Sequence, residues 1–119
     1  MKLQASAIEN VKADLSRVDD LLQENGFVRA GQWDYERVTY DRKFEIKDET
    51  FYLRIFGYAI DGDVGAKHAT IQLLAPLLGK HYYPHGVEYG EGENFPPNLI
   101  KTCEEILQRV AKGLDAIAN

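Results

Sequence analysis

The sequence lacks several features around which enzymes and secreted proteins are commonly built. It contains one cysteine, Cys103, so no disulfide can form within the chain. Its two serines, Ser6 and Ser16, stand outside any Gly-x-Ser-x-Gly nucleophile elbow. Neither a Walker phosphate loop nor a Gly-x-Gly-x-x-Gly motif occurs. These absences remove the common nucleophiles and phosphate cradles, and they favour a protein that is not an enzyme.

Basic residues are outnumbered by acidic residues. The chain has 14 Lys and Arg residues against 19 Asp and Glu residues, which gives a formal net charge of −5. Nucleic acids and anionic membrane surfaces are bound through basic faces, so neither is an expected partner. No stretch approaches the ~20 apolar residues of a membrane span, and the opening residues hold no apolar run typical of a signal peptide. We therefore expect a cytoplasmic protein.

What the chain does contain is enough apolar material for one ordinary domain. Hydrophobic residues make up 45% of the 119 residues, and aromatic residues make up 11%. A length of this order corresponds to one domain, and no repeat, low-complexity tract or linker divides the sequence. We expect a single domain over residues 1–119.

The first long segment has the spacing of an amphipathic helix. Its apolar residues recur at intervals of three and four, which places them on one stripe: Ile8, Val11, Leu15, Val18 and Leu22. Ser6 followed three residues later by Glu9 is a capping-box pattern for the start. Asn25 and Gly26 end the run, because glycine readily adopts the left-handed conformation after a helix. The pattern predicts a helix over residues 6–25.

The last segment has the same kind of spacing. Its apolar stripe consists of Leu99, Cys103, Ile106, Val110, Leu114 and Ile117. The Pro96–Pro97 pair suits a first turn, where a missing N–H is tolerated, and either Asn94 or Asn98 could cap it. The pattern predicts a helix over residues 96–117. Because Cys103 lies on the apolar stripe, we expect it to be a buried small hydrophobe rather than a nucleophile.

Between the predicted helices the apolar period changes to two, which is typical of strands. Within residues 33–46 one parity is apolar, and it consists of Val38, Tyr40, Phe44 and Ile46. Arg42 interrupts that parity. The sequence therefore predicts either a β-bulge at Arg42 or the end of the strand there.

Two further strands follow. Residues 51–60 are apolar on both parities, which is typical of a strand near the centre of a sheet. Residues 67–76 alternate again until Pro76, where a central strand ends or changes course. Residues 47–50 and 61–66 are rich in polar residues and glycine, and they are the predicted turns.

The order of elements is therefore helix, strands, helix. Short links between strands favour antiparallel pairing, so we expect an α+β fold with a sheet of about four strands over residues 33–89. Both helices should pack on one face of this sheet. The other face would then expose Tyr52, Phe56 and Tyr58 together. We expect a homodimer that buries part of this face, or the edge near Tyr83.

The most unusual stretch is residues 79–97, with the sequence GKHYYPHGVEYGEGENFPP. It concentrates aromatic and titratable side chains, namely His81, Tyr82, Tyr83, His85, Glu88, Tyr89, Glu91 and Glu93. Pro84 and the flanking glycines argue against a helix, so we expect residues 81–89 to form an extended segment. One side of that segment would carry His81, Tyr83, His85, Val87 and Tyr89, and the other would carry Tyr82, Pro84, Gly86 and Glu88.

Three interpretations of this stretch remain open. A ligand-binding surface would be lined by His81, Tyr82, Tyr83, His85 and Tyr89. A transition-metal site would combine imidazoles and carboxylates, from His81, His85, Glu88 and Glu91. The two histidines lie about 13 Å apart along a straight strand, so one metal would require a bend at Pro84 or Gly86. In the third interpretation the rings only pack a sheet edge or a dimer seam.

Three segments resemble the YugN-like family, small proteins of Bacillus-type bacteria. They are GFVRAGQWDYERVTYDRKFE at residues 26–45, YLRIFGYAIDGDVG at 52–65 and LLAPLLGKHYYPHGVEYGE at 73–91. The family is functionally uncharacterised, so the resemblance supplies no catalytic residues. It implies a bacterial cytoplasmic protein with an α+β fold.

Two functions from different classes follow from these observations. The first is a non-enzymatic binding or interaction module that acts as a homodimer, without a cofactor, and that binds a small molecule or a protein. The second is a small metal-dependent or acid/base enzyme that uses His81, His85 and nearby glutamates. The two differ in whether the purified protein holds a stoichiometric transition metal.

Overall fold

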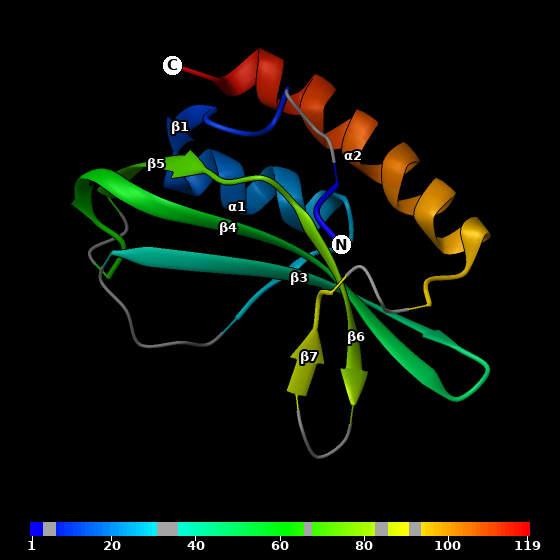
Figure 1. Cartoon of the computed structure of the whole chain (residues 1–119). Coiled ribbons are helices and arrows are strands. Elements are labelled where there is room, and N and C mark those ends of the chain that lie inside the picture. Colours follow the sequence, from blue (N-terminus) through cyan, green and yellow to red (C-terminus); the bar gives the residue numbers. More distant parts are fainter. Residues whose placement is uncertain (4–6, 31–35, 66–67, 83–85, 91–93) are drawn as a thin grey trace.

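The computed structural model of the chain is an α+β fold, with two helices and seven strands among the residues that it describes (Figure 1). The residues that it describes are 1–3, 7–30, 36–65, 68–82, 86–90 and 94–119. In chain order the elements are β1 (Lys12–Asp14), α1 (Leu15–Glu24), β2 (Val28–Arg29), β3 (Arg37–Ile46), β4 (Glu49–Asp63), β5 (His68–Leu73), β6 (Leu77–Tyr82), β7 (Gly86–Glu88) and α2 (Pro97–Ile117). The predicted α+β class and antiparallel pairing are confirmed. The predicted number of strands is wrong, because the described residues form a sheet of seven.

The sheet is built around β4, which is 15 residues long. β3 pairs with one edge of β4 from Arg37 opposite Tyr58 to Ile46 opposite Glu49. The other edge pairs first with β5 and then with β6, which follow one another on either side of residues 74–76. The sheet therefore changes course at Pro76, as the sequence predicts. The short strands β1, β2 and β7 pair with β5, β3 and β6 respectively.

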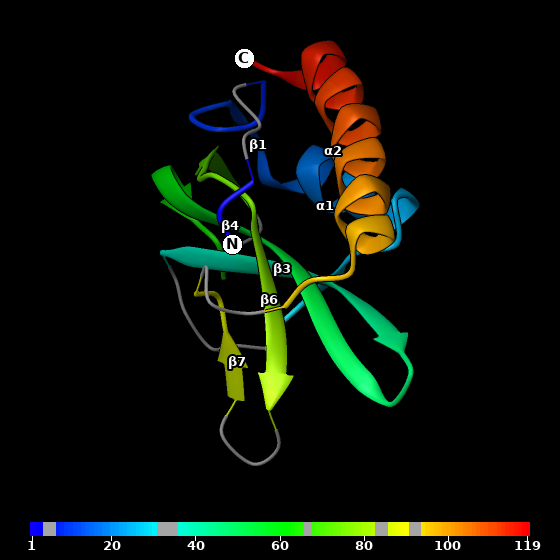
Figure 2. The ribbon, with the colours of Figure 1, turned by 45° about the vertical axis from the view of Figure 1, so that its right-hand side comes forward.

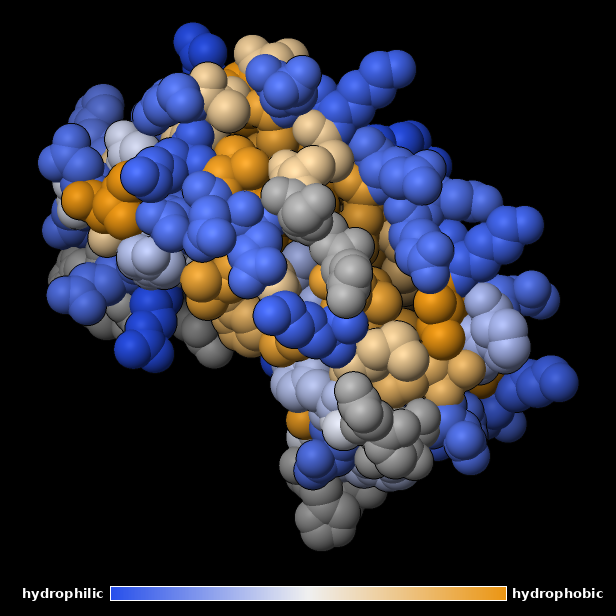
Figure 3. Space-filling model, turned by 45° about the horizontal axis from the view of Figure 1, so that its top comes forward, coloured by the Kyte–Doolittle hydropathy of each residue, from blue (hydrophilic) through white to orange (hydrophobic). Residues whose placement is uncertain are grey.

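Both helices lie on the same side of the sheet (Figures 1 and 2). The core fills the space between these two layers. Phe51, Leu53 and Ile55 of β4 are fully buried there, together with Leu22 of α1 and Val110 of α2. In Figure 3, which brings the helix side forward, hydrophilic side chains form most of the rim and hydrophobic ones show between them. The prediction that both helices cover one face is confirmed.

The first helix begins at Leu15, not at residue 6 as predicted. Ile8 is fully buried, but it lies in a turn ahead of β1. Asn10 has the left-handed φ of 70°, and its N–H donates to the Leu73 carbonyl at 2.8 Å. Leu73 in turn donates to the Val11 carbonyl at 2.9 Å. The edge of β5 offers backbone groups that need partners, and pairing with them replaces the helical turns that the spacing predicts. The proposed cap Ser6 lies outside the described residues.

The end of the first helix is as predicted. Gly26 has a φ of 84°, and its N–H donates to the Gln23 carbonyl at 3.0 Å. The N–H of Phe27 donates to the Leu22 carbonyl at 2.9 Å, and the Phe27 ring is buried. This arrangement satisfies carbonyls that the last turn leaves free, and only glycine adopts the required φ without strain.

The bulge predicted at Arg42 is wrong. The register between β3 and β4 is continuous through Arg42, which pairs with Leu53, and β3 continues to Ile46. Arg42 does point to the helix side, as its parity requires. Its guanidinium donates to the Asn25 carbonyl at 2.7 Å and lies 5.4 Å from the centre of the Phe44 ring. A cation at the C-terminal end of α1 satisfies the helix dipole, so the charge does not disrupt the strand. The irregularity in the sheet instead lies between Ala59 and Asp61.

The turn between β3 and β4 is tight. Lys47 and Asp48 have φ values of 48° and 67°, which are typical of a two-residue hairpin turn with a left-handed backbone. The predicted turn at 61–66 begins later than expected, because β4 continues to Asp63, and residue 66 lies outside the described residues.

The second helix runs over Pro97–Ile117, within one residue of the prediction. Pro96 occupies the cap position without a side-chain cap, so neither Asn94 nor Asn98 caps the helix. Cys103 is buried as predicted, and its burial raises the pKa of its thiol to about 11.

Neither of the two helices, within the part of the chain that the structure describes, has the length and apolar character that a membrane crossing requires.

Polar contacts tie the first helix to the sheet. The Tyr40 hydroxyl donates to Asp19 at 2.5 Å, and Arg29 of β2 lies 3.2 Å from the same carboxylate. Burial, followed by the bond to Asp19, raises the pKa of Tyr40 far above its ordinary value. A buried phenol requires a partner for its hydroxyl, and this carboxylate provides one.

Candidate functional site

The face of the sheet turned away from the helices is the candidate site, and we refer to it as the open face. From β4 it presents Tyr52, Arg54, Phe56 and Tyr58, which alternate with the buried core residues of the same strand. The first three are half-buried, and Tyr58 is 37% exposed. No described helix lies on this side, as Figure 2 shows. The open face is therefore both aromatic and accessible.

Arg54 occupies the centre of the open face. It pairs with the Asp41 carboxylate on β3 through two hydrogen bonds, of 2.6 and 3.0 Å, and it also donates to the Tyr89 hydroxyl. The bond to Asp41 raises the pKa of Arg54, so its charge is retained although its side chain is only 21% exposed. A fork of two parallel bonds fixes the plane of the guanidinium.

Aromatic rings surround that guanidinium. Its Cζ lies 5.8 Å from the centre of the Tyr52 ring and 5.9 Å from the centres of the Phe56 and Tyr89 rings. Each of these distances is short enough for a cation–π interaction. Burial raises the pKa of the Tyr89 hydroxyl, which favours its neutral form beside Arg54. The cluster of Arg54, Asp41 and three rings therefore holds the open face in one arrangement.

Gly79 allows the Tyr89 ring to pack against the sheet within this cluster. It lies on β6 opposite Tyr52, on the open face. A Cβ atom at this position would lie 2.3 Å from Val87 Cγ1 and 2.7 Å from Tyr89 Cε1. Only a residue without a side chain leaves room for these two side chains to lie against the sheet.

The stretch 81–89 is not the single extended segment that we predicted. β6 ends at Tyr82 and β7 begins at Gly86, and the two strands pair as a hairpin with His81 opposite Val87. Gly86 has a φ of 89°, a conformation in which the chain can reverse easily. The predicted division into two sides nevertheless holds for the described residues. His81, Val87 and Tyr89 lie on the open face, because residues paired across strands share a face.

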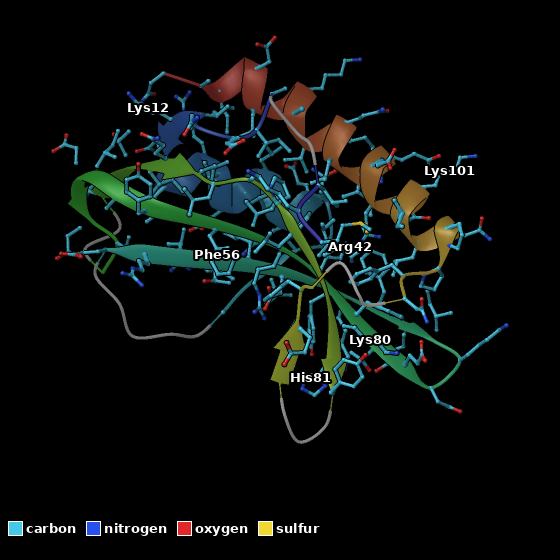
Figure 4. All side chains as sticks on the ribbon, in the orientation of Figure 1. Lys12, Arg42, Phe56, Lys80, His81 and Lys101 are labelled. Carbon is cyan, nitrogen blue, oxygen red and sulfur yellow. The ribbon has the colours of Figure 1, made fainter. Side chains whose placement is uncertain are left out.

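The structure separates the predicted site residues. His81 lies on the β6–β7 hairpin (Figure 4). It is on the open face, where its ring meets the Tyr52 ring edge-on with centres 6.1 Å apart. Tyr82 and Glu88 lie on the opposite side of the β6–β7 hairpin. Lys80 also lies on that side, 5.0 Å from the centre of the Tyr82 ring and 3.2 Å from Glu49. Tyr83, His85, Glu91 and Glu93 lie outside the described residues.

The predicted metal set is divided in the same way. His81 and Glu88 lie on opposite sides of the hairpin, while His85 and Glu91 lie outside the described residues. Within the described residues, no three side chains of His, Cys, Asp or Glu lie close enough to hold a metal ion. The metal site with His85 and Glu91 stays a prediction.

A hollow of about 440 Å³ lies at the β5 end of the open face. Its lining comes from Glu36, Arg37, Phe56, Tyr58, Ala59 and Leu74. Leu74 is 40% exposed, and it lies in the interruption between β5 and β6. Apolar and charged groups therefore meet in one depression beside the Arg54 cluster.

Sequence reasoning missed Arg54, Asp41 and Gly79. The signal for Arg54 was present, since a charged residue stands between Tyr52 and Phe56 in a strand that is otherwise apolar on both parities. Such a residue in a central strand requires a partner of opposite charge. Its partner lies 13 residues away, and only the strand register brings the two together.

Comparison with known proteins identifies relatives of the whole chain. The YugN-like family matches residues 3–112. The uncharacterized protein YlbA of Bacillus subtilis (strain 168) is 56% identical over 117 residues, which cover 98% of this chain and 98% of that protein. The uncharacterized protein YugN of the same strain is 25% identical over 91 residues, which cover 76% of this chain and 68% of that protein.

A solved structure has the same fold. The crystal structure of the uncharacterized conserved protein YugN from Geobacillus kaustophilus HTA426 is similar to this chain with a TM-score of 0.85 and 50% identity. The match covers 98% of this chain and 96% of that chain. These similarities confirm the resemblance carried by the three sequence segments, and the chain belongs to the YugN-like family.

Proposed function

We propose that this protein is a non-enzymatic binding module that acts as a homodimer in the bacterial cytoplasm, and that the open face is its binding surface. The observation that supports this proposal is the placement of α1 and α2 on one side of the sheet (Figures 1 and 2). It leaves Tyr52, Phe56 and Tyr58 on the side without a described helix. An aromatic sheet face of this kind is suited to contact with a partner.

The chemistry of the open face suits recognition rather than catalysis. Tyrosine and phenylalanine rings provide large contact area with few rotatable bonds. Arg54 binds Asp41 through Nε and Nη2 and Tyr89 through Nη1, so it serves to hold the rings rather than to attack or protonate a substrate. The neighbouring hollow of about 440 Å³ is of a size that small ligands occupy.

The predicted ligand residues extend this surface in part. His81 and Tyr89 lie on the open face beside the Arg54 cluster, and Tyr83 and His85 remain members of the predicted set. A small molecule or a protein segment would lie across Tyr58 and Phe56 toward His81. Tyr82 lies on the other side of the hairpin and would act separately.

Homodimer formation can be tested by light scattering of the purified chain at micromolar concentration. The expected mass is twice the 13.5 kDa of one chain. A mass of one chain across the concentration range would contradict the homodimer.

Binding at the open face can be tested by a thermal-shift screen with a small-molecule library. Compounds that raise the melting temperature of the unmodified chain should lose this effect on Tyr58→Ala. They should keep it on Lys101→Ala, which changes an exposed residue of α2. Shifts that persist in Tyr58→Ala would contradict the open face as the binding surface.

Elemental analysis separates this proposal from the metal-dependent enzyme. A transition metal held in a 1:1 ratio, and lost on changing His81 and His85 together, would contradict the non-enzymatic function. Protein purified without metal would favour the binding module.

A further inference from the structure

One stretch of sheet edge has no partner strand among the described residues. β3 is ten residues long, but β2 pairs only with Tyr40 and Asp41. One further bond, from the Ala30 N–H to the Thr39 carbonyl, extends this pairing at 2.8 Å. From Arg42 to Ile46 the described residues provide no strand on this edge. The edge belongs to the tip of the β3–β4 hairpin, which extends away from α2 in Figure 2.

The direction of the backbone groups along this edge follows from two hydrogen bonds. The Thr39 carbonyl accepts the Ala30 N–H on the β2 side of β3. The backbone N–H and C=O groups of the odd-numbered residues of β3 therefore point toward the outer edge of the sheet. The Glu36 carbonyl accepts the Ala59 N–H at 2.7 Å, so the backbone N–H and C=O groups of the even-numbered residues point toward β4. Lys43 and Glu45 therefore present their N–H and C=O groups at the outer edge.

The charges on this edge complement one another under twofold symmetry. Lys43 and Glu45 lie on the same face of β3, one residue to each side of Phe44. If a second β3 runs antiparallel with the axis at Phe44, Lys43 lies opposite Glu45 of the partner subunit, and Glu45 lies opposite Lys43 of the partner subunit. Opposite charges in directly opposed positions stabilise an antiparallel pair. The backbone hydrogen bonding is consistent with this register, because Lys43 and Glu45 both present their N–H and C=O groups at the outer edge.

We propose that two copies of this chain associate by antiparallel pairing of the Arg42–Ile46 edges of β3. The inference rests on the proposed homodimer, and it places the interface on the β3 edge instead of on the Tyr52, Phe56 and Tyr58 face or the edge near Tyr83, where we expected it from the sequence. The two sheets become one, and the two open faces lie on the same side of it. In the single chain Lys43 and Glu45 bind one another at 3.1 Å with both side chains more than half exposed, and such a surface pair is readily exchanged for the intersubunit pairs.

The length of the edge favours a second copy over another occupant. The free stretch is bounded by β2 at Asp41 and by the turn at Lys47 and Asp48. An extended peptide that continued past Asp41 would meet β2. The tip of a second β3–β4 hairpin ends at the required place, since its own turn follows Ile46. Phe44 would then lie beside its counterpart on the axis, in a pair without direct hydrogen bonds.

Charge exchange tests the arrangement. Lys43→Glu and Glu45→Lys each create like charges across the proposed interface, so each variant should shift the dimer toward the monomer in light scattering. The double variant Lys43→Glu with Glu45→Lys restores opposite charges and should restore the dimer. Lys101→Glu, which changes an exposed lysine on α2, is the matched control and should remain dimeric. Circular dichroism checks that each variant is folded.

A disulfide provides a second and independent measurement. In the Phe44→Cys variant the two new thiols face each other on the axis, at a separation that a disulfide can bridge. Mild oxidation should convert this variant to a covalent dimer, whereas Tyr58→Cys on the open face should stay uncross-linked. The unmodified chain is the control for Cys103, which is buried.

The outcomes separate this inference from the proposed function. A monomer in the unmodified chain overturns both. A dimer that is insensitive to the charge variants and is not cross-linked at Phe44→Cys overturns the β3 arrangement and leaves the homodimer standing. Loss of the dimer in both single charge variants, with recovery in the double variant, supports the β3 edge.

Discussion

The two faces of β4 are built from alternating residues of one strand, yet they are held in different ways. On the helix side, Phe51, Leu53 and Ile55 are fully buried against α1 and α2. On the open face, Tyr52 and Phe56 remain half-buried around the Arg54 and Asp41 ion pair. The first face is stabilised by removal of apolar surface from water, and the second by fixed polar and ring contacts. The open face is therefore ordered by these contacts while its rings stay partly exposed.

The largest loss of stability is expected for a change on the helix side of β4. Leu53→Ala removes a fully buried side chain beneath the helices, and it should lower the free energy of unfolding by about 2 to 5 kcal/mol. Leu15→Ala on α1 should behave in the same way, because Leu15 is also buried in this core. Urea unfolding measures both. Losses below about 1 kcal/mol in both variants would show that the helix layer is not the main source of stability.

A pH titration tests how well the helix side excludes water. Burial raises the pKa of Cys103 from its ordinary value of 9.0 to about 11. The unfolded chain therefore loses this proton first, so the contribution of this thiol to stability is constant below pH 9 and is lost as the pH rises toward 11. The loss amounts to roughly 2 to 3 kcal/mol for a shift of this size. Cys103→Ala should flatten this part of the curve. An unchanged slope in Cys103→Ala would indicate that other groups, such as tyrosines, cause the loss.

On the open face, Arg54→Ala should have an intermediate effect. It leaves the Asp41 carboxylate, which is 20% exposed, without its main partner. The expected loss of stability is about 1 to 3 kcal/mol. The double variant Arg54→Met with Asp41→Leu should recover part of this loss, because no unpaired charge remains. A double variant that is no better than Arg54→Ala would mean that the guanidinium acts through the rings rather than through the ion pair.

Tyr58→Ala should have the smallest effect on stability. Its side chain is 37% exposed at the end of the open face, and the change should stay within about 0.5 kcal/mol. Thermal unfolding can measure this. A drop similar to that of Leu53→Ala would show that the open face is part of the core, and it would remove the distinction between the two faces.

The two helices show how far the spacing of apolar residues can be relied on. α2 follows its spacing to within one residue of the prediction. The same kind of spacing fails over residues 7–14, where Asn10 and Val11 pair with Leu73 at the edge of β5. Ile8 is buried in either arrangement. Its apolar character predicted burial correctly, but the helix that the spacing predicted at this residue is wrong.

The candidate site shows a similar division. The period of two correctly placed Tyr52, Phe56 and Tyr58 together, and His81 with Tyr89, because neighbouring positions of a strand face opposite ways. It did not reveal that β6 reverses into β7, or that Arg54 joins Asp41 and Tyr89. These contacts depend on which strands are neighbours, and local spacing carries no information about that.

The sequence by itself determined the α+β class, the membership of the YugN-like family, the second helix, the glycine that ends the first helix and the division of β3 and β4 into two faces. Each of these depends on residues that are close together in the chain, or on a motif that can be read directly. Only the tertiary structure decided the number of strands, the start of α1, the role of Arg42 and the cluster around Arg54. The physical reason is that backbone groups at a sheet edge and charges in a central strand must find partners, and those partners lie far away in the sequence.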